Sequence, residues 1–157
     1  MSLEQSKIAF IGSGAMAEAI IKGILVKGLI APDHITASDP VPARQKVMTE
    51  TYGVTSTGDN DSAVAGADIV VMSIKPQVFS KVAVGLQGKV AKDALVLSIM
   101  AGITSTALQQ GLRHDRVVRA MPNTPAQLNM GVTAWMPTTA VTAAQREQTA
   151  LILSALG

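Results

Sequence analysis

The sequence predicts an α/β fold, in which helices cover both faces of a mostly parallel sheet. Short apolar runs typical of strands recur at spacings that leave room for a helix between them. Two of these runs, residues 69–72 and 95–99, lack polar alternation, as expected of central strands that are buried on both faces. Hydrophobic residues make up 48% of the chain and aromatic residues only 3%, so the core must be aliphatic. Such a core suits a parallel sheet between helices.

The elements follow one another in a strand–helix rhythm. Apolar runs predict strands at residues 7–11, 34–38, 68–74, 94–99, 116–120 and 132–136. The intervening segments predict helices at residues 15–26, 41–51, 80–89 and 105–112. Residues 53–61 are expected to form an irregular connection, and Asn60 or Asp61 is expected to cap a short helix that ends before Ala67.

The final helix is predicted from its start signal. Thr142 and Gln145 have the spacing of a capping box, and Leu151, Ile152 and Leu156 form an apolar stripe. Gly157 is typical of the residue that follows a helix end. We therefore expect residues 1–157 to be a single domain that is truncated at its C-terminal end.

Composition argues against several functions. The chain has 157 residues and a net charge of +2, and its densest basic stretch, residues 113–119, has no aromatic residue for base stacking. We expect no nucleic-acid partner. The absence of cysteine excludes thiolate chemistry and cysteine-ligated metals, and with only two histidines no metal site is expected. No apolar run approaches the roughly 18 residues that span a bilayer. We therefore expect no membrane partner and a cytoplasmic location.

A glycine-rich turn follows the first predicted strand. Gly12 allows a sharp turn, Gly14 lets the backbone approach a ligand, and Ala17 allows the next helix to pack closely on the strand. The helix predicted from Ala15 offers unpaired N–H groups and the positive end of its dipole to an anion. This pattern predicts a pyrophosphate site and a Rossmann-like, doubly wound sheet.

Asp39 follows the second predicted strand, about 20 residues beyond the glycine turn, the position from which a carboxylate accepts hydrogen bonds from an adenosine ribose. An alternative is that Asp39 only opens a turn with Pro40, because aspartate often begins turns. Both interpretations remain open from the sequence.

Three further segments follow predicted strands and should lie at the same edge of the sheet, where ligands of such folds bind. They are Ser73-Ile74-Lys75-Pro76-Gln77, Met100-Ala101-Gly102 and Met121-Pro122-Asn123-Thr124-Pro125. Pro76 restrains Lys75 to extended geometry, which predicts a rigid edge able to line a flat ring. As alternatives, Lys75 is only a surface charge, and Asn123 is only part of a proline-bracketed turn.

The sequence shows no nucleophile–base pair, paired carboxylates or metal cluster for hydrolysis or acyl transfer. Hydride transfer needs none of these, because a nicotinamide supplies the hydride and the protein orients it. We therefore expect a dinucleotide, NAD(H) or NADP(H), and assign no catalytic residue.

Taken in order, these segments resemble the N-terminal domain of pyrroline-5-carboxylate reductase over nearly the whole chain. The similarity rests on residues 10–17, on Ala67-Asp68 leading to residues 74–77, on residues 98–103, and on residues 119–125 with Gly131. It implies reduction of the cyclic imine 1-pyrroline-5-carboxylate to proline, in the pathway of proline biosynthesis. It also implies a cofactor that lies over residues 11–16 and reaches Asn60, passing residues 73–76 and 100–102 towards Asn123. With Asp39 and Arg44, the candidate cofactor-binding residues are Ile11, Gly12, Ser13, Gly14, Ala15, Met16, Asp39, Arg44, Asn60, Ser73, Ile74, Lys75, Pro76, Met100, Ala101, Gly102 and Asn123.

The chain departs from the family in two respects. The family often has a small polar residue, which holds the NADPH 2′-phosphate, where this chain has Asp39, and Arg44 is close enough to compensate. We expect weakened NADPH preference and real NADH use. The resemblance also implies that these 157 residues do not include the family's helical C-terminal domain, which forms the dimer and holds the substrate carboxylate. We expect a homo-oligomer for the full-length enzyme, and dinucleotide binding with little or no reductase activity for this chain.

Two other classes of function remain open from the sequence. β-Hydroxyacid dehydrogenases and deazaflavin-dependent NADP reductases have similar first domains, although the Met-Pro-Asn-Thr-Pro loop at residues 121–125 argues against them. The other class is a non-catalytic dinucleotide-binding module.

Overall fold

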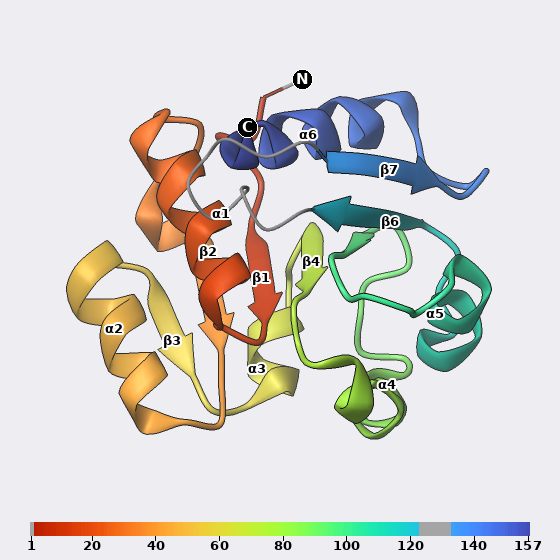
Figure 1. The fold of residues 1–157 in the computed structure, drawn as a ribbon, viewed down its shortest axis with the longest axis horizontal. Coiled ribbons are helices and arrows are strands. Elements are labelled where there is room, and N and C mark those ends of the chain that lie inside the picture. The colour runs from red at the N-terminus through yellow and green to blue at the C-terminus, as the bar shows by residue number, and fades with distance from the viewer. Residues whose placement is uncertain (1, 123–132) are drawn as a thin grey trace.

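The computed structural model describes residues 2–122 and 133–157, which form one seven-stranded sheet with helices on both faces (Figure 1). The strands are β1 (Ile8–Ile11), β2 (Ile35–Ser38), β3 (Thr55–Thr57), β4 (Ile69–Met72), β5 (Leu95–Ser98), β6 (Val117–Pro122) and β7 (Thr133–Pro137). The α/β class expected from the sequence is confirmed.

The strand order is β3-β2-β1-β4-β5-β6-β7. All neighbouring pairs are parallel except β6 and β7, which pair antiparallel. The chain runs outward from β1 to β3, then returns to place β4 on the other side of β1. A doubly wound sheet binds ligands at this reversal, outside the carboxyl ends of the strands. The loops after β1 and β4 lie at that point.

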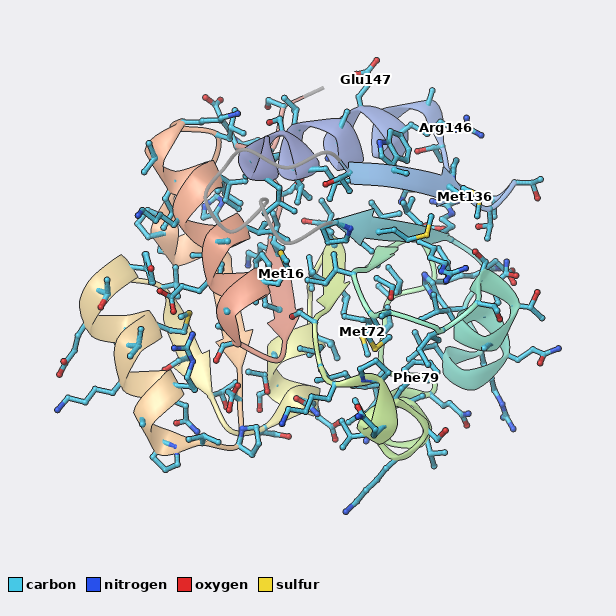
Figure 2. The ribbon with its side chains drawn as sticks, in the orientation of Figure 1. Met16, Met72, Phe79, Met136, Arg146 and Glu147 are labelled. Carbon is cyan, nitrogen blue, oxygen red and sulfur yellow. The ribbon has the colours of Figure 1, made fainter. Side chains whose placement is uncertain are left out.

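Two layers of helices enclose the sheet. The α-helices are α1 (Ala15–Val26), α2 (Pro42–Tyr52), α3 (Asn60–Val64), α4 (Phe79–Leu86), α5 (Ser105–Leu112) and α6 (Ala143–Leu153), and the 3-10 turns are η1 (Pro32–His34), η2 (Pro76–Val78) and η4 (Ser154–Leu156). Side chains of α1, α6 and η4 form one buried cluster with β1, and those of α3, α4 and α5 form a second with β4. Met72 and Phe79 both belong to the second cluster and lie on the α4 side of the sheet (Figure 2).

The capping box of α6 is confirmed. The Gln145 backbone N–H donates to Thr142 Oγ1 at 3.1 Å, and Gln145 Oε1 accepts from the Thr142 N–H at 3.1 Å. The predicted bounds of α1 and α5 also agree with the structure. Gly157 follows η4, so the chain passes from α6 through a tighter 3-10 turn before it reaches this glycine.

Several predicted boundaries are wrong. The connection expected at residues 53–61 contains β3, a polar edge strand that pairs with β2. The cap of α3 is Asp59, whose Oδ1 accepts from the Asp61 N–H, rather than Asn60 or Asp61. Helix α4 ends at Leu86, because Gln87 and Gly88 leave helical geometry. Strand β4 ends at Met72, and β6 continues to Pro122 through its pairing with β7.

Candidate functional site

The turn after β1 has backbone geometry that requires glycine. Gly12 has a φ of +96°, and a Cβ there would lie 2.7 Å from the Ser73 carbonyl oxygen. The Gly12 N–H donates to the carbonyl oxygen of Ser38 at 2.8 Å. Any larger residue would therefore meet both backbone strain and the backbone of the neighbouring strand. The tight-turn role expected for Gly12 is consistent with this geometry.

Ser73 links the end of β4 to this turn. Its N–H donates to the Ile11 carbonyl oxygen at 2.9 Å, and its hydroxyl donates to the Gly12 carbonyl oxygen at 2.7 Å. Ile74 also lies against the turn, because its Cγ2 would be 3.0 Å from a Cβ on Gly12. These contacts join the two loops at the topological reversal into one rigid edge.

The N-terminus of α1 opens directly beside the turn. Gly14 is its N-cap, and no side chain of residues 2–122 or 133–157 caps it. The first helical bond runs from the Glu18 N–H to the Gly14 carbonyl oxygen at 2.9 Å, so the N–H groups of Ala15 and Met16 precede the helical ladder. A Cβ on Gly14 would meet nothing within 4 Å. Open space, unpaired N–H groups and a helix dipole together fit an anion such as a pyrophosphate.

Asp39 lies immediately after β2, with its carboxylate turned towards the glycine turn. Its Oδ2 accepts hydrogen bonds from the Ser13 N–H and the Ser13 hydroxyl, each at 3.0 Å. Its Oδ1 accepts from the Val41 N–H at 2.9 Å, as in an aspartate turn. The two interpretations of Asp39 are thus compatible, because the residue opens a turn and also places a negative charge at the glycine loop.

Arg44 reaches the same loop from α2. Its Nε and Nη2 both donate to the Ser13 carbonyl oxygen, the former at 2.8 Å. Nη2 also donates to Glu18 Oε1 at 2.7 Å, and the Tyr52 hydroxyl donates to Glu18 Oε2 at 2.7 Å. The Tyr52 hydrogen bond and then the Arg44 guanidinium lower the pKa of Glu18. Burial and the bond to Glu18 raise the pKa of Tyr52 to about 12.

Asn60 joins this edge through Ser38. The Ser38 hydroxyl donates to Asn60 Oδ1 at 2.6 Å, which places the amide at the end of β2. Asn60 also lines a hollow of about 480 Å³ that has Val78 and Lys81 on its other side. Its position is compatible with contact to the adenosine end of a dinucleotide.

The other predicted residues lie further along the edge. Lys75 is exposed and extended, with φ −65° and ψ 137°, and Pro76 begins η2, as the rigid-edge interpretation requires. Beyond β5, the Ile99 N–H donates to the Met72 carbonyl oxygen at 3.1 Å, which joins this segment to β4. Met100 is buried, whereas Ala101 and Gly102 are exposed. Asn123 lies outside the described residues.

Sequence reasoning missed two members of this arrangement. Neither Glu18 nor Tyr52 was singled out from the sequence. Acidic residues are common in the first turn of a helix because their charge interacts favourably with the helix dipole, so Glu18 gives no distinctive signal. The bond between Tyr52 and Glu18 spans 34 residues and depends on how α1 and α2 pack. No local pattern in the sequence encodes that contact.

A family model described as NADP oxidoreductase coenzyme F420-dependent matches residues 7–102. The chain belongs to this family. The matched segment contains all candidate residues except Asn123. None of the helices in residues 2–122 and 133–157 is long and apolar enough to cross a membrane.

Curated relatives narrow this similarity. The chain is 38% identical over 156 residues to the pyrroline-5-carboxylate reductase of Vibrio alginolyticus, covering 99% of the chain and 57% of the relative. It is 40% identical over 152 residues to the pyrroline-5-carboxylate reductase of Pseudomonas aeruginosa, covering 96% of the chain and 55% of the relative. A solved structure of a pyrroline-5-carboxylate reductase from Coxiella burnetii aligns with a TM-score of 0.94 and 31% identity, covering 98% of this chain and 57% of the other. The resemblance to the N-terminal domain of this reductase is confirmed. The chain spans about half the length of these relatives.

Proposed function

We propose that this chain binds NAD(H) or NADP(H) and forms the cofactor-binding half of a pyrroline-5-carboxylate reductase. The observation that carries the proposal is the uncapped N-terminus of α1 beside Gly12 and Gly14, at the reversal of the strand order. A bound reduced nicotinamide supplies the hydride that converts the cyclic imine to proline, while a proton goes to the imine nitrogen. The chain's own residues bind and orient that group.

The candidate residues other than Arg44 each have a part in this proposal. The backbone of residues 11–16 holds the pyrophosphate, and Asp39 accepts hydrogen bonds from the adenosine ribose. Asn60 lies near the same ribose, while residues 73–76 and 100–102 line the path towards the nicotinamide. Asn123 completes the set at the nicotinamide end.

The carboxylate of Asp39 is the basis on which we propose a preference between NADH and NADPH. Its carboxylate is held in place by the Ser13 N–H and hydroxyl, and a fixed negative charge repels a 2′-phosphate. We expect real NADH use and weakened NADPH preference. NADPH binding at least tenfold tighter than NADH binding would contradict this expectation.

A decisive experiment combines binding and turnover in the 157-residue chain. Isothermal titration with each dinucleotide measures binding, and absorbance at the reduced nicotinamide band measures imine-dependent oxidation. We expect binding with little or no turnover, because the chain covers only about half of its relatives. Binding to neither dinucleotide by folded protein would contradict the proposal, and robust turnover would contradict the expected inactivity.

A non-catalytic binding module is the second candidate, because the same partial coverage is compatible with binding alone. Adding the remaining half of a related reductase, fused at the C-terminus, distinguishes the two. Turnover by the fusion supports a reductase half, whereas binding without turnover in both forms favours a module.

A further inference from the structure

Two opposite charges lie beside Ser13 of the glycine turn, one from Asp39 after β2 and one from Arg44 on α2. A ribose 2′ substituent is expected close to them, and this inference rests on the dinucleotide binding proposed above. Asp39 contributes a carboxylate and Arg44 a guanidinium. Asp39 favours a free 2′-hydroxyl and Arg44 favours a 2′-phosphate. Which group dominates depends on whether the guanidinium can approach the ligand with its charge unpaired.

Arg44 already has protein partners. Its Nε and Nη2 donate to the Ser13 carbonyl oxygen, and Nη2 forms an ion pair with Glu18 Oε1 at 2.7 Å. The side chains of Arg44 and Glu18 are 30% and 32% exposed, so solvent screens the pair only partly. A 2′-phosphate that binds through Nε or Nη2 would have to displace the Ser13 carbonyl oxygen or Glu18, and one that binds through Nη1 alone would meet a guanidinium whose charge Glu18 already balances.

Glu18 is itself held by a second contact. The Tyr52 hydroxyl donates to Glu18 Oε2 at 2.7 Å, so Arg44 and Tyr52 bind opposite oxygens of one carboxylate. The Tyr52 ring packs against the first core cluster, which limits its movement. Glu18 therefore keeps a fixed place beside the guanidinium, and Lys22 is a second, more weakly coupled positive charge near Glu18.

We propose that Glu18 and Tyr52 are positioning residues that set the dinucleotide preference by holding and neutralising Arg44. Neither residue needs to touch the ligand. Glu18 keeps the guanidinium on the Ser13 carbonyl oxygen, and Tyr52 keeps Glu18 in place. The Asp39 charge then decides the preference in favour of a free 2′-hydroxyl.

Replacing Glu18 by glutamine tests the proposal. Glu18→Gln removes one negative charge and weakens the hold on Arg44, so NADPH affinity rises relative to NADH. Partly exposed ion pairs contribute modestly, so we expect the ratio of the two dissociation constants to move about fivefold towards NADPH. Tyr52→Phe keeps the ring packing and removes only the hydroxyl, so it moves the ratio in the same direction by about twofold.

Glu50→Gln provides the matched control. Glu50 is an exposed carboxylate on the same α2 helix as Arg44, and its replacement changes the net charge by the same amount. Titration of wild type and each variant with NADH and with NADPH gives the two dissociation constants. A merely structural role for Glu18 would change both constants equally and leave their ratio unmoved.

A double-mutant cycle with Arg44→Gln tests the route through Arg44. We expect the Glu18→Gln effect on the ratio to shrink in that background, and an undiminished effect would overturn the role given to Arg44. If wild type binds NADH but Glu18→Gln and Glu50→Gln give the same ratio of dissociation constants, the role of Glu18 is refuted while the proposed dinucleotide binding stands. Should Glu18→Gln fail to fold, an unmoved ratio in Tyr52→Phe overturns it. If wild type binds neither dinucleotide, the proposed function fails and the inference with it.

Discussion

Replacing Gly14 by alanine should separate ligand binding from stability. Gly14 has φ −72° and ψ −169°, which alanine adopts without strain, and a Cβ there meets nothing within 4 Å. Alanine restricts the unfolded chain, which stabilises, but it is a poorer N-cap than glycine. These effects oppose each other, so we expect the free energy of unfolding to change by less than about 1 kcal/mol. The melting temperature should then move by no more than about 4 °C.

Dinucleotide affinity should respond differently to the same change. The added methyl group occupies the space through which the pyrophosphate approaches the N–H groups of α1. We expect NADH affinity to fall at least about tenfold, or about 1.4 kcal/mol. Calorimetric titration measures the affinity and thermal unfolding measures the stability. A Gly14→Ala variant that binds NADH within a factor of two of wild type would refute the pyrophosphate site.

Gly12→Ala is the contrasting variant. Its φ of +96° and the 2.7 Å approach of a Cβ to the Ser73 carbonyl oxygen make alanine unfavourable in the folded chain. The strained backbone alone costs about 1–2 kcal/mol, and the steric overlap adds to this. Gly12→Ala should therefore lose both stability and affinity, whereas Gly14→Ala should lose affinity alone.

Three further predictions concern other parts of the chain. A Cβ on Gly23 would lie 2.5 Å from Ala155 Cβ, so Gly23→Ala should lower the free energy of unfolding by about 2 kcal/mol. NADH affinity in the folded protein should stay unchanged, and unchanged thermal stability would contradict the close packing of α1 on η4. Asp39→Asn removes the charge near the 2′ position, and the ratio of dissociation constants should move about fivefold or more towards NADPH; competitive titration with both dinucleotides measures it, and an unmoved ratio would exclude Asp39 as the determinant. The folded-state pKa of Tyr52 is raised from its ordinary value of 10.0 to about 12, so its contribution to stability is complete below pH 10 and is lost as the pH rises towards 12. Denaturant unfolding should therefore show that raising the pH from about 9 to about 11.5 lowers the free energy of unfolding more in wild type than in Tyr52→Phe. Equal decreases in the two proteins would show that the Tyr52–Glu18 bond adds no stability.

Local sterics explain why much of the site could be predicted from the sequence. The glycine turn requires particular residues at neighbouring positions, so Gly12, Gly14 and the start of α1 were recognisable. Asp39 was recognisable because its distance from the turn is set by one helix and one strand. The α5 helix was placed correctly, because Thr104 caps it with a side-chain bond to the Ala107 N–H.

Features that depend on tertiary packing were not predictable. Strand β3 has only three polar residues and owes its structure to pairing with β2 at the sheet edge, so it shows no apolar run. The contacts of Glu18 with Arg44 and Tyr52 join α1 to α2 across 26 and 34 residues. Their existence depends on the angle and register between two helices, which no local pattern specifies.

Calorimetric titration of the 157-residue chain with NADH and NADPH tests the central claim most directly. The glycine turn and the open end of α1 predict saturable binding of both dinucleotides. We expect the dissociation constant for NADH to be less than about ten times that for NADPH. Absence of heat with either dinucleotide, in protein shown by circular dichroism to be folded, would contradict the assignment of this edge of the sheet as a dinucleotide site.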